Sequence, residues 1–474
     1  MNNSLLGMVN NYKLCNDITH YNHDFDVNIQ ITLIYCDAMC ERTRIDREVL
    51  PELYRLYQLN SFSSIEAIEM DKKIPFDLIE QWEMETLDSL LFSGKIVISF
   101  NHLNKGYSLS IANLPNRKTE ETNIEVAIRG PKDGLVEDIE TNIGLIRKRL
   151  PVASVSIEKF SIGTITKTKV GLIYHNDKIN KETLTSIRDK LRQTEKKIEE
   201  LISANQLEEL ISDAPYTLFP LTVYTGRPDF IASCLLRGRF IVLIDGVPGA
   251  MVAPINLFML LKTPEDTHFN YISASFGRLL RLLSLISSIF LPSFYVALTS
   301  YHQDQIPFGL LATITITRFG IPLSVPLEMF LILLLLEIFK EAGFRLPSAI
   351  GQTLTVVGGI IIGDAAIRAG LISPTMIVVA AMSIVASSTL VSQTLTGAVS
   401  ILRFFAVIFS SVLGMYGFMM SLLFFTVYLT KLYSFGVPYL APISPITMKD
   451  IIRSLIMVPS KFKPRIPKYL KKNK

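Results

Sequence analysis

A few charged side chains stand inside the apolar C-terminal third of this chain, and they are the first candidates for chemistry. Glu328 and Glu337 bracket the run Leu333-Leu-Leu-Leu, and their spacing places them on opposite sides of a helix. An unpaired charge in lipid costs several kcal/mol, so neither side chain is expected to face acyl chains. For Glu337, a role in gating or permeation and a structural ion pair near a membrane surface are equal alternatives. Glu337 and Glu341 share a helix face, with Lys340 and Arg345 available as ion-pair partners.

A second set of candidates lies in residues 346–370, which are apolar yet rich in small residues. Gly359 and Gly363 form a GxxxG step, which lets helices approach closely. Asp364 and Arg368 have the spacing to pair across one helical turn, and a structural pair is favoured over a functional one. Non-helical backbone at membrane depth persists only inside protein or along a water-filled cavity. Candidates for gating or permeation here are Gln352, Thr353, Gly359, Gly363 and Asp364.

Long apolar runs must position these groups. The run from Leu282 to Leu298 is long enough to cross a hydrocarbon core of about 30 Å. The predicted spans are 282–301, 321–339, 374–395 and 404–428, with Arg278 and Arg281 as anchors at the membrane edge. Residues 1–30 lack a signal peptide and the C-terminal tail is basic, so both termini are predicted to be cytoplasmic. The number of crossings is then even: four plus a re-entrant segment at 348–366, or six.

Composition excludes several classes of protein. The 474 residues are 49% hydrophobic, with a mean hydropathy of +0.35, more than a soluble protein of this size needs. A net charge of +4 is too small to indicate nucleic-acid binding, and four cysteines give no secreted disulfide framework. No nucleophile–base set or cluster of metal ligands is recognisable, so we expect no enzyme, cofactor or metal site.

The sequence before residue 270 has the patterning of a water-exposed α/β protein. Apolar β-rich segments at 27–35, 95–100, 107–112, 155–165 and 170–174 alternate with stretches of helical spacing. We therefore predict a multidomain membrane protein, with a cytoplasmic α/β region of two subdomains followed by an all-α multi-span domain. The predicted divisions are a polar tail (1–26), α/β subdomains 27–116 and 123–265, a transmembrane domain (278–432) and a basic tail (433–474).

The stretch Arg129-Gly-Pro-Lys-Asp-Gly suits a helix start, because a proline at the first helical position gives up no needed N–H. Arg129 and Lys132 beside that start predict either a capping turn, which is favoured, or an anion site. One long charged helix is expected over 181–212. The apolar segment 250–261 is too short for a span and is predicted to be buried, interfacial or re-entrant.

Several motifs in order resemble one family, the A subunit of the spore germinant receptors (the GerA family) of endospore-forming bacteria. The resemblance covers about residues 30–445. It rests on these strings: Arg129-Gly-Pro-Lys-Asp-Gly-Leu-Val-Glu-Asp-Ile-Glu-Thr-Asn-Ile-Gly-Leu-Ile-Arg-Lys-Arg, Arg227-Pro-Asp, Gly238-Arg with the strand to Asp245, Glu341-Ala-Gly-Phe-Arg-Leu-Pro, Gly351-Gln-Thr, Val357-Gly-Gly, Ile362-Gly and Ser434-Phe-Gly-Val-Pro-Tyr. The same strings do not separate a receptor A subunit from its paralogue encoded with the spore dipicolinate-release proteins.

The resemblance implies residence in the spore inner membrane, beside a transporter-like B subunit and a lipoprotein C subunit. It also implies that A subunits oligomerise into a ring that conducts ions when a nutrient is sensed. Inter-subunit or structural roles are expected for Arg129, Lys132, Arg227, Asp229, Glu341, Arg345 and Arg368.

Three positions depart from the family pattern. Gly226 stands where the family has a glutamate before Arg-Pro-Asp, Leu333 replaces an expected acidic residue, and Asp364 replaces a glutamine. In the family pattern, Glu337 and the acidic residue expected at position 333 form an acidic pair. If that pair lines a pore, this chain has lost a negative charge at Leu333 and gained one at Asp364, so ion selectivity or activity would differ.

Three functions from different classes follow. The leading one is a non-enzymatic membrane subunit that opens a path for monovalent cations when a partner binds nutrient. A secondary transporter is the rival, but it needs a midplane site between repeats, and no internal repeat is visible. The third is a membrane scaffold whose N-terminal region docks other germination proteins.

Overall fold

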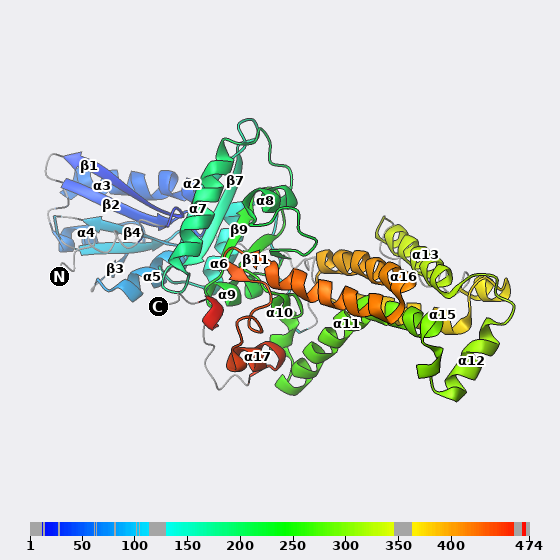
Figure 1. Ribbon diagram of the computed structural model, residues 1–474. Helices are drawn as coiled ribbons and strands as arrows, with labels where there is room; N and C mark the ends of the chain where they lie inside the picture. Colours follow the sequence, from blue (N-terminus) through cyan, green and yellow to red (C-terminus); the bar gives the residue numbers. More distant parts are fainter. Residues whose placement is uncertain are drawn as a thin grey trace.

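The computed structural model describes residues 12, 15–26, 29–60, 62, 64–79, 82–100, 102–103, 105–112, 129–345, 363–458 and 467–470. The predicted site residues Gln352, Thr353 and Gly359 lie outside these residues, as do 459–466 and 471–474 of the basic tail. Figure 1 shows two parts: a β-rich N-terminal module, residues 12–268, at one end, and a helical module, residues 271–431, at the other.

The first subdomain is an antiparallel five-stranded sheet with strand order β1-β2-β4-β5-β3. Its strands are β1 (Ile18–Asp26), β2 (Ile29–Cys36), β3 (Asp77–Ile79), β4 (Lys95–Phe100) and β5 (Lys105–Ser110). Both faces of β2 are buried: Leu33 packs with α3 (Leu50–Asn60) and α4 (Ile65–Asp71), and Ile34 packs with α5 (Met84–Phe92) and the second subdomain. Residues 18–26 were predicted to belong to a polar tail. They instead form β1, which pairs antiparallel with the whole length of β2.

The second subdomain repeats this plan with strand order β6-β7-β9-β10-β8. Its strands are β6 (Val155–Ile162), β7 (Thr168–His175), β8 (Val223–Thr225), β9 (Phe240–Ile244) and β10 (Ala250–Ala253). On one face pack α6 (Ile139–Arg149) and α9 (Pro228–Leu235); on the other pack α7 (Lys181–Glu195) and α8 (Ala204–Ile211). Segment 250–261 is buried as β10 and α10 (Leu257–Leu260), one of the predicted alternatives.

Two predicted helix boundaries in this subdomain are wrong. Helix α6 begins at Ile139 and not at Gly130-Pro131, because Asp138 caps it by accepting from the Thr141 N–H. The helix expected over 181–212 breaks after Glu195, since the backbone carbonyls of Ile198 and Glu199 accept from the β6–β7 turn. The Ser203 cap then starts α8.

The described residues of the helical module, 271–345 and 363–431, form η4 (Gln303–Gln305) and the helices α11 (Tyr271–Tyr301), α12 (Phe308–Arg318), α13 (Val325–Arg345), α15 (Pro374–Ser388) and α16 (Gln393–Lys431). Among the described residues, α11 and α16 are long and apolar enough to cross a membrane. The span predicted at 374–395 is wrong: α15 ends at Ser388, and Ser392 caps a new helix. The prediction of one uninterrupted span at 404–428 is also wrong, because the helical backbone of α16 is broken at Gly414.

Gly414 turns α16 back on itself, as the two orange helices in Figure 1 show. Its φ of 59° and ψ of −136° lie outside the helical region, in backbone space that favours glycine. The Phe405 and Phe424 rings, on the two sides of the turn, are 5.4 Å apart between centroids. The α16 halves therefore form an antiparallel hairpin, and each is close to spanning length.

Contacts between helices fix their directions. Tyr295 of α11 donates to Thr375 near the start of α15, and Ser383 near its end donates to the Ser288 carbonyl, so α15 is antiparallel to α11. Glu328 near the start of α13 meets Ser373 just before α15. Helix α13 later meets Ser400 near the start of α16. Both α11 and α16 have one end beside the N-terminal module (Figure 1).

The chain after α16 does not begin as a loose tail. It forms a small hairpin of β11 (Tyr433–Ser434) and β12 (Val437–Pro438), followed by α17 (Met448–Leu455) and η5 (Lys468–Leu470). Ser434 donates to the Leu221 carbonyl and accepts from the Ile255 N–H, so this hairpin is pinned to the N-terminal module. One continuous apolar core runs from the first subdomain through the second into α11 and α16.

Candidate functional site

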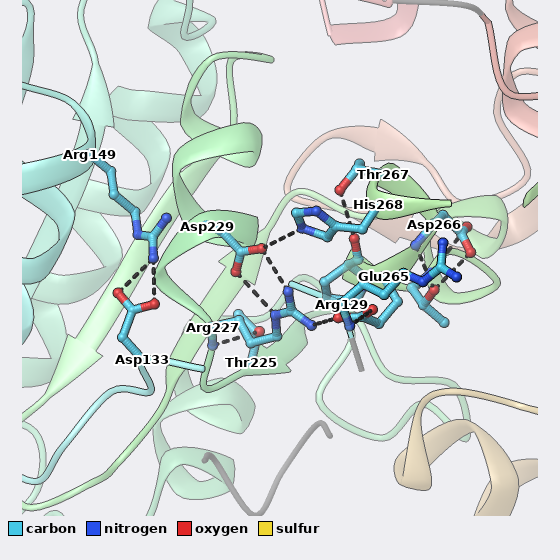
Figure 2. Close-up of polar contacts among 12 residues, drawn as sticks. Arg129, Asp133, Arg149, Thr225, Arg227, Asp229, Glu265, Asp266, Thr267 and His268 are labelled. Carbon is cyan, nitrogen blue, oxygen red and sulfur yellow. Dashed lines mark hydrogen bonds and ion pairs between the residues drawn. The ribbon is translucent and has the colours of Figure 1, made fainter. Parts of the chain in front are cut away.

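The predicted residues Arg129, Arg227 and Asp229 meet in a polar cluster at the base of the N-terminal module (Figure 2). Arg227, 1% exposed, directs its guanidinium to two carboxylates. It reaches Asp229 at 2.8 and 3.1 Å and Glu265 at 2.5 Å. Burial alone would raise the pKa of Asp229, but hydrogen bonds and charge from Arg227 outweigh it and lower that pKa. The cluster is therefore ionised and internally neutralised.

The Arg129-Gly130-Pro131 turn lies directly against this cluster. The Arg129 backbone N–H donates to Glu265 at 3.1 Å, and its guanidinium lies over the Phe269 ring. A Cβ at Gly130 would come within 2.1 Å of the Arg227 guanidinium, so a side chain here would displace that guanidinium from its carboxylates. The motif that was predicted to start a helix instead seals a buried ion pair. Lys132 is exposed beyond the turn.

Asp266, which follows Glu265 in the sequence, contacts the helical module and not Arg227. It belongs to η3 (Pro264–His268), which Thr263 and Asp266 close with a capping box. Its carboxylate accepts from Arg278 at 2.9 Å and from Arg281 at 2.8 and 3.2 Å, both on α11. Arg278 and Arg281, which were predicted to be membrane-edge anchors, form ion pairs that attach the first apolar helix to η3. Burial opposes ionisation of Asp266, but these arginines and Thr263 lower its pKa.

Two consecutive carboxylates thus join the modules. Glu265 faces Arg227 and the Gly130 turn, whereas Asp266 faces α11. We call the chain of ion pairs from Arg227 through Glu265 and Asp266 to Arg278 and Arg281 the relay. Figure 2 shows its residues Arg227, Glu265 and Asp266, with His268 beside Asp229 (Nε2 to Oδ2 3.5 Å). A displacement of the second subdomain would be carried through η3 to α11 along contacts that are short and largely buried.

Inside the helical module, Glu328 and Glu337 face different helices, as their spacing predicts. Glu328 is fully buried and accepts from the Ser373 N–H and hydroxyl at 2.5 Å, with Arg318 at 3.5 Å. Glu337 is about one-quarter exposed and pairs with Lys340 at 2.7 Å and with the Ser400 hydroxyl of α16 at 3.1 Å. Leu333 between them is completely buried in the apolar core.

The remaining predicted residues fall into three groups. Asp364 and Arg368 form an ion pair at 2.7 Å, both well exposed, with Gly363 beside them. Glu341 is exposed near the end of α13, and Arg345 ends that helix. Gln352, Thr353 and Gly359 cannot be placed, since they lie outside the described residues. The functional roles of all these residues stay predictions.

Sequence reasoning missed half of the relay. Glu265 was placed at the end of subdomain 123–265, Asp266 and His268 lay between the predicted domains, and none of the three was given a role. One signal was available: Thr263-Pro-Glu-Asp has the pattern of a capping box with proline at the first position, immediately before an apolar helix. It also missed Arg403, 1% exposed on α16, which donates to the Ser288 carbonyl at 2.8 Å.

The fold and the site define a protein in which a β-rich module is tied by a buried ion-pair relay to an apolar helical module. The family profile described as Bacillus/Clostridium GerA spore germination protein matches residues 7–469. The chain therefore belongs to the GerA family of spore germination proteins.

Similar proteins support this membership over nearly the whole chain. Spore germination protein XA of Bacillus anthracis is 42% identical over 461 residues, which cover 97% of this chain and 92% of that protein. Spore germination protein A1 of Bacillus subtilis (strain 168) is 34% identical over 381 residues, covering 80% and 78%. Among solved structures, the N-terminal domain of the A subunit of the Bacillus megaterium spore germinant receptor GerK3 has 23% identity and a TM-score of 0.39, covering 53% of this chain and 92% of that one.

Proposed function

We propose that this chain is an integral membrane subunit of a nutrient germinant receptor that triggers spore germination. It would reside in the spore inner membrane with both ends in the cytoplasm. It would assemble with copies of itself, a transporter-like B subunit and a lipoprotein C subunit, and open a path for monovalent cations. Membership in a family of spore germination proteins supports the germination role.

The observation that carries the membrane proposal is the inverted polarity of the helical module. Large apolar side chains point outward along α11 and α16, for example Leu283, Ile408, Leu423 and Phe424, each about half exposed or more. Soluble monomers rarely expose so much contiguous apolar surface. Charged and hydroxyl groups such as Glu328, Ser383 and Arg403 are buried instead. This is the arrangement expected when the surrounding solvent is lipid.

The cation-path proposal is supported by the position of Glu337. It stands between α13 and α16, held by Lys340 and Ser400, and keeps about one-quarter of its surface exposed. A carboxylate with a hydroxyl partner and an exposed edge is suited to a ring of acidic groups that attracts cations. The helical module meets the N-terminal module at two places: η3 holds the start of α11, and Ser434, just after α16, bonds to Leu221 and Ile255.

The test is cation flux from proteoliposomes that contain this chain with its B and C partners. Glu337→Gln should reduce nutrient-triggered cation flux severalfold without preventing assembly, because it removes the charge but keeps the side-chain size. Glu182→Gln, at an exposed position on α7, is the charge-matched control and should conduct as the unmodified protein does. Normal flux in Glu337→Gln would remove the permeation role, and saturable solute counterflow would favour a transporter.

A further inference from the structure

A cavity of about 50 Å³ opens at the junction between the modules, and its polar wall is mainly basic. Arg237 and Arg239 reach it from the segment after α9, Lys262 from the segment after α10, and Arg278 from α11. A cavity of this size holds about three or four waters, which is close to the volume of one tetrahedral oxyanion. We call this cavity the junction pocket.

The positive charge around the junction pocket is not balanced by nearby carboxylates. Its wall contains Asp229, but that carboxylate is already bound by Arg227. Arg278 shares Asp266 with Arg281, and Arg239 donates through Nε to the neutral carbonyl of Pro254 at 3.1 Å.

Among the residues that the structure describes, neither Arg237 nor Lys262 forms an ion pair, although the more distant charge of Asp266 favours the protonated form of Lys262. Desolvation and the neighbouring charges of Arg278, Arg237 and Arg239 lower the pKa of Lys262 well below its usual value. Desolvation also lowers the pKa of Arg237. Partly buried cations that crowd together without counter-charge are costly unless an anion joins them.

We propose that the junction pocket binds a phosphate-class oxyanion, held by Arg237, Arg239, Lys262 and Arg278. Guanidinium forks match phosphate oxygens in pairs, and a lysine adds a point charge. The Ser233 hydroxyl also lines the pocket and offers a further donor. The phosphate group belongs to a free phosphate or to a phospholipid headgroup. This inference does not depend on ion conduction, and its failure would leave the cation-path proposal untouched.

Occupancy would bear on the contact between modules, because Arg278 belongs to both sites. It donates to Asp266 in the relay and also lines the pocket. An anion in the pocket would draw part of its guanidinium away from Asp266 or hold it in place from the other side. Binding would therefore change the stability of the start of α11.

The experiment uses the full chain in neutral detergent and radiolabelled inorganic phosphate in equilibrium dialysis. We expect saturable binding of one phosphate per chain. The double variant Arg237→Gln/Lys262→Gln should weaken binding by roughly tenfold or more, since two charge-assisted contacts are lost. The matched control Lys181→Gln/Arg192→Gln removes the same charge from exposed positions on α7 and should bind as the unmodified chain does.

A second arm identifies the source of the phosphate group. The same proteins are placed in nanodiscs of phosphatidylcholine with or without phosphatidylglycerol, and thermal unfolding is measured. Stabilisation by phosphatidylglycerol that the double variant loses, without dialysis binding of free phosphate, identifies a headgroup; the reverse identifies free phosphate.

A third variant guards against misfolding of the double variant. Ser233→Asp puts a carboxylate among the cations, so it should abolish phosphate binding while raising the thermal unfolding midpoint. Phosphate and lipid responses that are the same in the unmodified chain and both pocket variants would overturn the proposal. So would the absence of any response in the unmodified chain.

Discussion

Two junctions in this molecule are built from arginine and aspartate, and they solve the same problem differently. Between the two subdomains, Asp17 and Arg147 form a single pair at 2.7 and 3.0 Å, and both side chains are completely buried. Between the N-terminal and helical modules, one carboxylate, Asp266, serves Arg278 and Arg281 beside a pocket with surplus cations. The charges at the first junction neutralise each other, whereas positive charge exceeds negative charge at the second.

The difference teaches where motion is expected. Arg147 also donates to the Val152 carbonyl and lies over the Phe92 ring, so its guanidinium is held on several sides. A fully satisfied buried pair has one favourable arrangement. A carboxylate shared by two arginines, with further cations nearby, has several arrangements of similar energy. We infer that the subdomain junction transmits force rigidly and that the junction at η3 adjusts.

The largest expected effect comes from breaking the balanced junction. Asp17→Asn leaves Arg147 buried without a counter-charge and should lower the free energy of unfolding by about 3–5 kcal/mol. Trp82, the single tryptophan, packs against β5 of the first subdomain at Gly106 and reports unfolding in urea by its fluorescence. Asp77→Asn, which removes an exposed pair with Lys95, is the control and should change stability by less than about 1 kcal/mol. Equal effects in the two variants would contradict a special role for the buried pair.

A smaller and more local effect is expected from the shared carboxylate. Asp266→Asn should destabilise the chain by about 1–3 kcal/mol, because both arginines keep some contact with water and Arg281 still donates to the Leu261 carbonyl. The effect should appear as faster hydrogen exchange in residues 271–281, with little change in the first subdomain. Asp133→Asn, which loses a partly exposed pair with Arg149, is the matched control. Uniform exchange changes across the protein would argue against an adjustable junction.

Acid should weaken the junction at η3 through its carboxylates. The pKa values of Asp229, Glu265 and Asp266 are lowered in the folded chain from ordinary values of 3.8, 4.5 and 3.8. Their stabilisation is therefore present above the ordinary pKa values and is lost as pH falls through the lower folded ones. The thermal unfolding midpoint should drop increasingly below about pH 4.5. The slope should be shallower in Asp266→Asn; an unchanged slope would exclude this carboxylate as a contributor.

The smallest effect is expected at the exposed pair of the helical module. Asp364→Asn should change stability by no more than about 0.5 kcal/mol, because its contact with Arg368 is open to solvent. Thermal unfolding in detergent measures this directly. A larger loss would mean that Asp364 is covered in the assembled receptor, and a change in cation selectivity without a stability change would assign it to the conducting path.

Local patterns predicted much of the N-terminal module. Alternating apolar residues located β4 and β5, and 3.6-residue spacing located α6 and α7, because these signals come from neighbours in sequence. The sequence also singled out Arg227 and Asp229, and the structure places them together. The pairing of Glu265 with Arg227 was not foreseen, since 38 residues separate them. The pairing of Asp266 with Arg278 and Arg281 was not foreseen because charge alone does not indicate which carboxylate meets which arginine.

The helical module was harder to predict for a different reason. Uniformly apolar sequence hides breaks, so a single glycine at 414 reversed the chain inside an apparent span. The end of α15 at Ser388 was hidden by serines and threonines, which are common in helices that pack in lipid. Caps at Ser392 and Thr263 were the readable signals, and both mark the true starts of elements.

The neighbouring positions of Glu265 and Asp266 have one more consequence. Consecutive residues of a 3₁₀-helix point about 120° apart, so the two carboxylates leave η3 in different directions and cannot be moved independently. Rolling η3 about its axis toward α11 lifts Glu265 from Arg227, and rolling it back loosens Arg278. A rotation of the short helix that shortens one of these two ion-pair contacts therefore lengthens the other.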